Sequence, residues 1–365
     1  MKSFDLIVIG GGIAGLGIAE QAGARGLSAL VLEARSCCSQ TSDNTLRIIH
    51  GGFRYLQNFD FPRLVRSLRD QTELLRDVPA ALTPLPCLMP LTKFGLKSRL
   101  SVACAALLYR TFMQASRSPL IPPRTLSSHE AESLAPFLVG KVPYGALCWY
   151  DAVMSEPSLV RNYLAERCTQ SGVTILTNRP VVSLARSGRD FEIRDQEGTV
   201  WSAPRVVNSM GPWLDTLNLP SEFAGLRPGW CKGFNLIVSR QFDAQCGISL
   251  EGSDGRLFFC VPRGSGTAIG TWYEPHPPNS LPPQVSHEEI QRFLRAINDA
   301  IGTEEITPSD IVGFDVGVLP TMHRGTGSPV PLAHERISAH AGYIEVVSTK
   351  YTTFRSQARA VMQHL

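Results

Sequence analysis

The sequence predicts an α/β protein, in which a domain built on a central parallel sheet is interleaved with a second, mainly antiparallel β domain (α+β). Two observations favour this class. Short, continuously apolar strands alternate with helical segments near the N-terminus and again after residue 157, which is typical of a parallel sheet covered by helices. Residues 216–303 are instead rich in strands separated by proline and glycine turns, which favours antiparallel pairing.

The N-terminal segment has the pattern of a Rossmann-like dinucleotide-binding unit. The apolar strand Phe4–Ile9 runs directly into Gly10, Gly12 and Gly15, and Glu33 ends a second apolar strand 18 residues later. The first glycine permits a tight turn, the second lets the backbone approach a pyrophosphate, and the third lets the next helix pack on the sheet. The pyrophosphate would lie at the helix N-terminus, and the carboxylate would accept hydrogen bonds from a ribose. We therefore expect an adenine-dinucleotide cofactor.

Composition bounds the class of protein further. The chain has 365 residues, 43% hydrophobic and 18% charged, which is enough for two globular domains. Its net charge of +3 comes without a run of Lys or Arg, so we expect no nucleic-acid partner. The nine cysteines lack metal-ligand spacing and predict reduced thiols, with Cys37–Cys38 two ordinary ones, and no metal site. The N-terminal apolar stretch is too short for a secretory signal, so we expect a cytoplasmic protein.

Periodicity predicts the remaining elements. Helical spacing of apolar residues indicates helices at Arg63–Leu75 and Pro157–Gln170, and the second leads into the strand Val173–Leu176 of the parallel sheet. Short runs of apolar residues, separated by polar ones, across Val181–Val200 indicate an antiparallel ribbon. A further strand is expected at Arg205–Asn208. Later elements are the strands Phe234–Val238, Arg256–Val261 and Thr267–Thr271, a helix near Glu288–Ala300, a strand from Ile306, and a last helix from about Thr352.

The order of these elements predicts two interleaved domains. Residues 1–90, 151–215 and 306–365 would form a discontinuous cofactor-binding domain. Residues 91–150 and 216–305 would form a substrate or cap domain.

The segment Leu96–Leu120 reads as a basic amphipathic helix. Its apolar residues are flanked by Lys97, Arg99, Arg110 and Arg117, and the uncharged stretch is shorter than the ~20 residues that span a bilayer. Two placements fit this pattern: packing on its own domain, or lying in a membrane interface. In the second case the protein would be peripheral to the inner face of a membrane.

A second set of motifs resembles the FAD-dependent glycerol-3-phosphate dehydrogenases. The segment Ser42–Leu56, which contains His50-Gly51-Gly52-Phe53-Arg54-Tyr55-Leu56, is similar to the signature of that family. Further matches follow in the same order: Asp151 with Glu156–Leu159, then Val206–Trp213, then Lys350–Arg355. The resemblance covers nearly the whole chain and places it in the wider D-amino-acid oxidase (DAO) superfamily of flavoproteins. Those dehydrogenases usually carry a further helical C-terminal domain, whereas this sequence ends at Leu365.

The resemblance implies FAD as the cofactor. The glycine turn would hold the pyrophosphate, the Thr41–Thr45 segment would supply donors near it, and His50 to Gly52 would pass beside the isoalloxazine ring. A helix N-terminus at Lys350–Thr353 would stabilise the negative charge of the reduced ring. The implied cofactor positions are Gly10, Gly12, Ile13, Ala14, Gly15, Glu33, Ala34, Arg35, Thr41, Ser42, Asn44, Thr45, His50, Gly51, Gly52, Val181, Val182, Gly211, Trp213, Lys350, Tyr351, Thr352 and Thr353.

Four residues carry the catalytic expectations. Arg54 would give a bidentate fork and Lys350 a point charge for an anionic substrate group. His50 would act as a base, or would only orient the loop and the flavin. Tyr55 would be a pocket wall or a proton partner.

The departures from the resemblance fall on the substrate side. Leu319 stands where those dehydrogenases have an arginine that faces the substrate phosphate, and Asn235 stands where they have a histidine. A lost charge-assisted contact is worth roughly 1.5–3 kcal/mol. His323 and Arg324 would be candidates to replace the missing cation.

The sequence thus predicts an FAD-dependent dehydrogenase or oxidase. It would transfer a hydride from the CH–OH group of a small anionic substrate, glycerol-3-phosphate or a related hydroxy acid, to flavin N5. Two alternatives remain: an amino-acid or amine oxidase (CH–NH) of the same superfamily, and a non-catalytic FAD-binding regulatory protein. For the electron acceptor a quinone, oxygen or another protein remain open.

Overall fold

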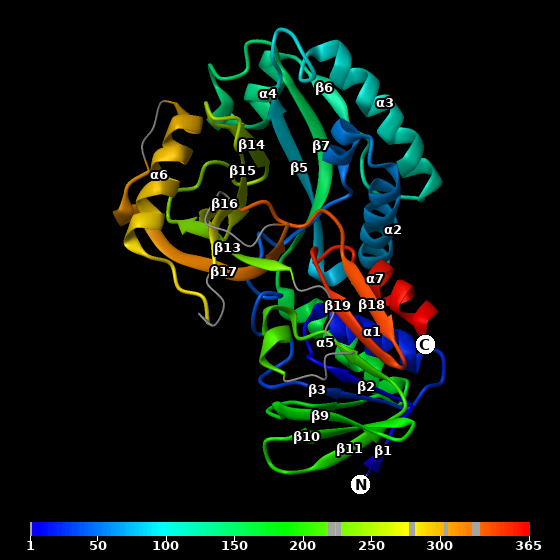
Figure 1. Cartoon of the computed structure of the whole chain (residues 1–365). Coiled ribbons are helices and arrows are strands. Elements are labelled where there is room, and N and C mark those ends of the chain that lie inside the picture. The colour runs from blue at the N-terminus through cyan, green and yellow to red at the C-terminus, as the bar shows by residue number, and fades with distance from the viewer. Residues whose placement is uncertain (1, 218–222, 224–227, 277–281, 303–305, 323–328) are drawn as a thin grey trace.

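The computed structural model describes residues 2–217, 223, 228–276, 282–302, 306–322 and 329–365. Three sheets organise it (Figure 1). A six-stranded sheet has the order β18-β19-β12-β2-β3-β8, and all of its pairs are parallel except β18–β19. Its strands are β2 (Leu6–Ile9), β3 (Ala29–Leu32), β8 (Thr174–Leu176), β12 (Val206–Asn208), β18 (Arg336–His340) and β19 (Tyr343–Val347).

Three helices pack on this sheet. They are α1 (Ile13–Gly23), α5 (Pro157–Gln170) and α7 (Phe354–Val361). The strands β2 and β3 are continuously apolar and fully buried, as expected for a parallel sheet covered by helices. Gly17 allows α1 to approach α7, because a Cβ there would lie 2.5 Å from the Phe354 ring. The positive end of α1 is thereby held at the carboxyl edge of β2, where the glycine turn lies.

A four-stranded sheet lies beside this core at the base of the molecule (Figure 1). Its order is β1-β11-β10-β9, with β9–β10 and β10–β11 antiparallel. The antiparallel ribbon predicted over Val181–Val200 is therefore confirmed. The strands are β1 (Lys2–Ser3), β9 (Val181–Ser187), β10 (Asp190–Asp195) and β11 (Val200–Ala203).

The third sheet has nine strands in the order β17-β13-β16-β15-β14-β5-β7-β4, with β6 paired to β7. Its pairs are antiparallel apart from β14–β5. The strands are β4 (Ile48–Ile49), β5 (Leu82–Pro90), β6 (Arg124–Leu126), β7 (Ala146–Met154), β13 (Gly229–Val238), β14 (Gly247–Glu251), β15 (Leu257–Arg263), β16 (Gly266–Pro275) and β17 (Ile311–Thr321).

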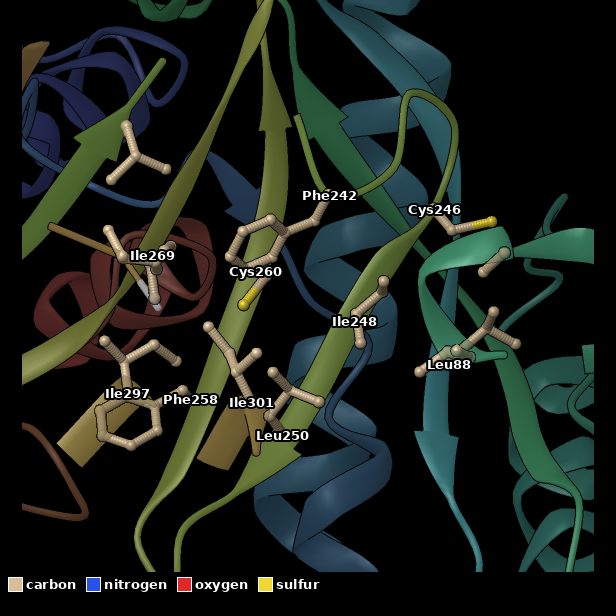
Figure 2. Close-up of a cluster of buried hydrophobic side chains, with 14 of the residues drawn as sticks. Leu88, Phe242, Cys246, Ile248, Leu250, Phe258, Cys260, Ile269, Ile297 and Ile301 are labelled. Atoms are coloured by element: carbon tan, nitrogen blue, oxygen red, sulfur yellow. The ribbon is translucent and has the colours of Figure 1, made fainter. Parts of the chain in front are cut away.

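The nine-stranded sheet has helices of its own. Figure 1 shows α6 on one side of it and α2 and α3 on the other. Figure 2 shows part of its core, where Phe258, Cys260 and Ile269 from the strands meet Ile297 and Ile301 from α6. The helices are α2 (Phe61–Asp77), α3 (Arg99–Ala115), α4 (Ser128–Leu134) and α6 (His287–Ile301), and the short 3₁₀ turns are η1 (Phe53–Asn58), η2 (Pro79–Ala81), η3 (Pro136–Leu138), η4 (Gly211–Thr216), η6 (Pro308–Asp310) and η7 (Met362–His364).

Several segments that we assigned to the cofactor-binding domain join neither the six-stranded nor the four-stranded sheet. Within residues 1–90, 151–215 and 306–365, the strands β4, β5 and β17 and the end of β7 lie in the nine-stranded sheet. The reason is long antiparallel pairing, since β5 pairs with β7 from Leu82 to Pro90 and β17 pairs with β13 from Ile311 to Thr321. The predicted helix Pro157–Gln170 and the expected strand at Ala29–Leu32 have the bounds expected.

The helix α3 is shorter than the predicted segment Leu96–Leu120. Its inner face packs on its own domain through Val102, Ala106, Tyr109 and Met113. Among the described residues, no helix is long and apolar enough to cross a bilayer.

Candidate active site

A cavity of about 510 Å³ lies where the six-stranded and nine-stranded sheets meet. It is lined by the glycine turn after β2, the 33–45 segment after β3, the start of η4, strands β13, β16 and β17, and residues 348–352 before α7. Its size is in the range of small-molecule and cofactor sites. Most positions implied for the cofactor line it: Gly10, Gly12, Ile13, Ala14, Glu33, Ala34, Arg35, Thr41, Ser42, Asn44, Thr45, His50, Val181, Gly211, Trp213, Lys350, Tyr351 and Thr352.

Each glycine of the turn has a distinct steric reason. Gly10 has a φ of +97°, a left-handed conformation that favours glycine. A Cβ on Gly15 would lie 1.9 Å from the Gly10 carbonyl oxygen, so this position needs glycine for packing rather than for contact with a ligand. Gly12 is different, because the nearest atom to a Cβ there would be the Ser42 Oγ at 3.4 Å. The protein leaves room at Gly12, which is the position that faces a bound pyrophosphate in this kind of turn.

Side chains of two neighbouring loops complete the phosphate end. The Glu33 carboxylate accepts hydrogen bonds from the Gly11 amide at 2.6 Å and the Arg35 amide at 2.8 Å, and each oxygen keeps a lone pair for a further donor. The Ser42 Oγ accepts from the Ile13 amide at the start of α1 at 3.1 Å. These contacts hold the 41–45 segment at the positive end of α1, which favours an anion.

The same segment is attached to the strand β17. The Thr41 Oγ1 accepts from the Val318 amide at 3.2 Å, and the Asn44 Oδ1 accepts from the Val316 amide at 3.3 Å. A Cβ on Gly317 would lie 3.0 Å from the Thr41 Cγ2, so glycine lets the two segments approach. The phosphate end of the cavity and the substrate-side strand are thus joined directly.

Five implied cofactor positions do not line the cavity. Gly15 lies behind the turn, and Val182 is 53% exposed on the outer side of β9. Gly51 and Gly52 lie one and two residues beyond the lining His50, and Thr353 is the N-cap of α7. The backbone alternation of a strand explains why Val181 reaches the cavity and Val182 does not.

The segment His50–Gly52 rests on a buried carboxylate. The Asp151 side chain accepts hydrogen bonds from the Gly51 amide at 2.7 Å, the Trp149 Nε1 at 2.9 Å and the Gln71 Nε2 at 3.2 Å. Burial raises the pKa of Asp151 above its ordinary value. A buried carboxylate is costly unless donors surround it, so Asp151 holds this loop in a defined place.

His50 and Lys350, which both line the cavity, have strongly lowered pKa values. Burial, followed by the charges of Lys350, Arg63 and Arg54, lowers the pKa of His50 to about 3. Burial, followed by Arg63 and Arg54, lowers the pKa of Lys350 to about 8. At neutral pH the cavity therefore holds a neutral imidazole beside an ammonium group, and both lie in a field of further positive charge.

The predicted catalytic residues Arg54 and Tyr55 are not among the residues that line the cavity. Arg54 is exposed on η1. Tyr55 is buried, and its ring meets the His50 ring edge-on, with the two ring centroids 5.8 Å apart. Sequence reasoning missed Arg63, whose guanidinium lies 4.1 Å from the Tyr55 ring centroid and whose charge acts on both His50 and Lys350. Its place in the amphipathic pattern of α2 gave no signal of this role.

The substrate side of the cavity is formed by the nine-stranded sheet. The Asn235 Oδ1 accepts from the Thr271 Oγ1 at 2.9 Å, which leaves the amide Nδ2 as the group available to a ligand. Leu319 also lines the cavity, and its Cδ1 would lie 2.9 Å from a Cβ on Gly233. An amide donor and an isobutyl group therefore stand in place of an imidazole and a guanidinium. The candidate replacements His323 and Arg324 lie outside the described residues.

The cysteines of the chain are thiols that form no disulfide. All nine cysteines are free, and burial raises the pKa of Cys37 to about 11, which keeps it an inert thiol. Within the part of the chain that the structure describes, no group of three His, Cys, Asp or Glu residues is placed to hold a metal ion.

A glycine turn with room at Gly12, a helix N-terminus behind it and a carboxylate after the second strand are the features of a dinucleotide-binding protein. The chain belongs to the FAD dependent oxidoreductase family DAO, whose family model matches residues 5–345. The predicted fold class, family and cofactor are thereby confirmed.

Several known proteins that are similar to this chain are named as dehydrogenases of phosphorylated polyols. It is 29% identical to glycerol-3-phosphate dehydrogenase 2 of Mycobacterium bovis over 98% of this chain, and it spans 62% of that relative's length. It is 29% identical to D-erythritol 1-phosphate dehydrogenase of Brucella abortus over 100% of this chain and 74% of that one. A structure of glycerol-3-phosphate dehydrogenase from Bacillus halodurans with FAD superposes with a TM-score of 0.73 at 22% identity, covering 99% of this chain and 64% of that one.

Proposed function

We propose that this protein oxidises the CH–OH group of a small anionic substrate, glycerol-3-phosphate or a related hydroxy acid. One observation carries the proposal. Lys350 lines the cavity with no carboxylate partner among the described residues, beside an imidazole that stays neutral at physiological pH, and the charge of the exposed Arg54 acts on both groups. An unpaired buried cation such as Lys350 is costly unless an anion binds there.

Different residues of the chain would bind the cofactor, bind the substrate and accept its proton. When bound, FAD supplies a ring that accepts a hydride at N5. The glycine turn, Glu33 and Ser42 would hold its phosphates and ribose. Arg54 and Lys350 would hold the anionic group of the substrate, and His50 would take the proton of the hydroxyl that becomes a carbonyl.

The substrate class follows from the same cavity and from the relatives. Two relatives are named for dehydrogenation of a phosphorylated polyol, and this supports glycerol-3-phosphate as the first substrate to test. Leu319 leaves one fewer cation on β17 than the dehydrogenase pattern has, which supports weaker phosphate binding or a substrate with a single negative charge.

We further propose that the six-stranded and four-stranded sheets form the cofactor domain. The nine-stranded sheet with α6 would form the substrate domain. The cavity between them supports this division, because its phosphate end comes from the first and its substrate side from the second.

The test of the proposal compares a charged with an uncharged substrate. Arg54→Ala should raise KM for glycerol-3-phosphate by about 10-fold to 100-fold, because a charge-assisted contact worth roughly 1.5–3 kcal/mol is lost. KM for glycerol, which has no anionic group, should not change, and flavin content should stay at the wild-type level. Arg189→Ala, an exposed arginine between β9 and β10, is the matched control. An unchanged KM for glycerol-3-phosphate in Arg54→Ala would remove this residue from the site.

We also propose that the outer face of α3 and the loops beside it contact an anionic membrane surface. Phe94, Leu96, Leu100, Leu107 and Ile121 are exposed there, with Leu100 at 76% and Leu107 at 66%. Lys93, Arg99, Arg110 and Arg117 lie among them in the chain and are exposed as well. An apolar centre with a basic rim suits the interface of anionic lipids.

Co-sedimentation with vesicles tests this surface. The wild type should sediment with vesicles that contain phosphatidylglycerol, and the double variant Leu100→Gln, Leu107→Gln should stay in the supernatant. Val312→Gln, at an equally exposed apolar residue on β17, is the control and should behave as the wild type. Equal sedimentation of the double variant would refute the proposal.

For the electron acceptor, a quinone, oxygen and another protein stay open. Oxygen uptake measured against quinone reduction distinguishes the first two.

A further inference from the structure

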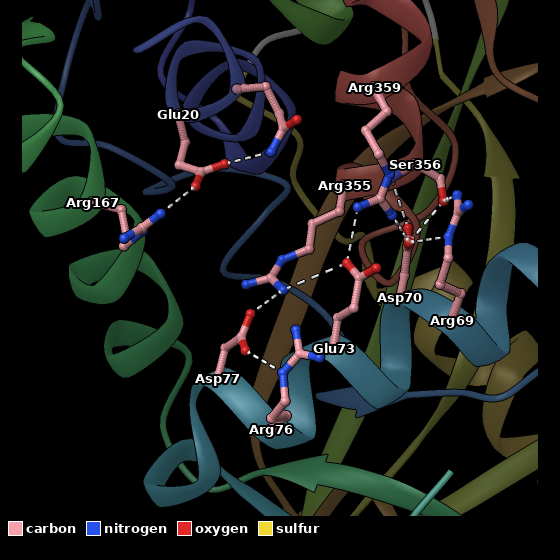
Figure 3. A network of polar contacts seen from close by, with 11 residues as sticks. Glu20, Arg69, Asp70, Glu73, Arg76, Asp77, Arg167, Arg355, Ser356 and Arg359 are labelled. Atoms are coloured by element: carbon pink, nitrogen blue, oxygen red, sulfur yellow. Dashed lines mark hydrogen bonds and ion pairs between the residues drawn. The ribbon is translucent and has the colours of Figure 1, made fainter. Parts of the chain in front are cut away.

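The helix α7 is capped by a residue from another helix. Its own N-cap residue, Thr353, makes no side-chain capping bond. Instead the Asp70 carboxylate of α2 accepts from the Ser356 amide at 2.8 Å and from the Ser356 Oγ at 2.7 Å (Figure 3). The Ser356 amide is one of the first donors of α7, which have no partner within the helix. Asp70 thus provides the N-terminal cap of α7 from 286 residues away in the sequence.

A network of ion pairs surrounds this cap. Arg359 of α7 pairs with Asp70 at 2.6 Å and with Glu73 at 2.9 Å, and Arg355 pairs with Asp77 at 2.6 Å. Figure 3 shows these carboxylates along one face of α2, opposite the arginines of α7. Asp70 is fully buried, whereas Asp77 is partly exposed at the other end of the network. The two helices are therefore joined along most of α7, from Arg355 to Arg359.

The residues before α7 reach the candidate active site directly. Lys350, Tyr351 and Thr352 line the cavity. The Thr352 Oγ1 also accepts from the His50 amide at 3.3 Å. A change in the position of the α7 N-terminus, or in the charge there, would therefore act on both Lys350 and the His50 loop.

We infer that Asp70 is a positioning residue that sets the reduction potential of the bound flavin through the N-terminus of α7. The inference rests on the proposed function in one respect, namely that the flavin ring lies at the Lys350–Thr352 end of the cavity. A helix N-terminus stabilises negative charge, which reduced flavin accumulates. A carboxylate that takes up one of the helix donors offsets that effect and lowers the potential.

A purely structural role does not require a charge at this place. Asn caps helix N-termini about as well as Asp, and a neutral cap would avoid the cost of burying a carboxylate. The buried carboxylate also needs Arg359 and Arg69 as counter-charges, at 2.6 Å and 3.7 Å. A change of charge at Asp70 should therefore move the potential even where the fold is retained.

Asp70→Asn in the flavin-loaded protein tests the inference. We expect sulfite, which adds to oxidised flavin in proportion to its electron affinity, to bind about 10-fold more tightly. The two-electron midpoint potential should rise by about 30 mV, which is the equivalent of a tenfold change. Asp77→Asn removes a charge from the same network at a carboxylate that accepts no bond from Ser356, and it should leave both quantities unchanged. Flavin content and thermal unfolding are recorded for each variant.

The outcomes separate this inference from the proposed function. An unchanged potential in flavin-loaded Asp70→Asn, or an equal shift in Asp77→Asn, would overturn the role of Asp70. If Asp70→Asn does not fold, Arg359→Gln decides, because removing a positive charge beside the carboxylate should lower the potential, and no change would overturn the inference. A wild-type protein that binds no flavin would instead refute the proposed function.

Discussion

Burial and neighbouring arginines lower the pKa of both Lys350 and His50, and their charges at neutral pH differ because lysine starts from a higher ordinary pKa than histidine. Burial disfavours the charged form of each base, and Arg63 and Arg54 add repulsion. The lowered pKa of His50 leaves it neutral across the physiological range. The lowered pKa of Lys350, about 8, leaves most of it charged at neutral pH and available to an anion.

This difference predicts the pH dependence of substrate capture. Lys350 is protonated below its pKa of about 8 and loses its charge as the pH rises through that value. The ratio kcat/KM for glycerol-3-phosphate should therefore fall above pH 8, because this ratio reports the ionisation of the free enzyme. In Lys350→Arg the side chain stays charged and the fall should disappear. A wild-type profile that is flat to pH 9.5, or a Lys350→Arg profile that keeps the fall, would contradict the assignment.

At the scale of elements, the glycine turn after β2 separates packing from ligand binding. A Cβ on Gly15 meets the Gly10 carbonyl oxygen at 1.9 Å, whereas a Cβ on Gly12 has only the Ser42 Oγ nearby at 3.4 Å. We expect Gly12→Ala to unfold at the same temperature as the wild type when both lack flavin, since the protein itself has room for the methyl group. Its affinity for FAD should nevertheless fall at least 10-fold.

Gly15→Ala is the matched comparison for this turn. It should lower the unfolding temperature of the flavin-free protein as well as the FAD affinity, because the clash is within the protein. Titration of the flavin-free variants with FAD and thermal unfolding measure the two effects. If Gly12→Ala bound FAD as tightly as the wild type, the pyrophosphate would not lie at this turn.

The elements that the sequence predicted best are those with a local signal. The turn after β2 and the bounds of α5 follow from glycine spacing and helical periodicity. The place of β17 does not, because an apolar strand looks alike whether it joins a parallel or an antiparallel sheet. Asp70 shows the same limit, since its partner Ser356 lies 286 residues away. The local hint was that Ser67, Asp70 and Gln71, all polar, lie on the buried side of α2.

At the scale of the whole molecule, two sheets of different construction meet at one cavity. The Thr41–Asn44 segment joins the phosphate end to β17, and Asp70 joins α2 to the helix that begins at the cavity. Bound cofactor and substrate would therefore each lie against both parts. The resemblance in sequence implied most of the residues that line the cavity around the glycine turn, whereas the proposed substrate side depends on side chains brought together by β13, β16 and β17.

We propose above all that this chain holds FAD and reduces it with a small anionic alcohol. The most direct measurement is the flavin absorbance of the purified protein under anaerobic conditions after addition of glycerol-3-phosphate, with glycerol and a panel of hydroxy and amino acids as comparisons. We expect the absorbance of the oxidised flavin to bleach with glycerol-3-phosphate or an anionic hydroxy acid and not with glycerol. Bleaching by amino acids alone would contradict the proposed substrate class, and bound flavin that no compound reduces would contradict the proposed activity.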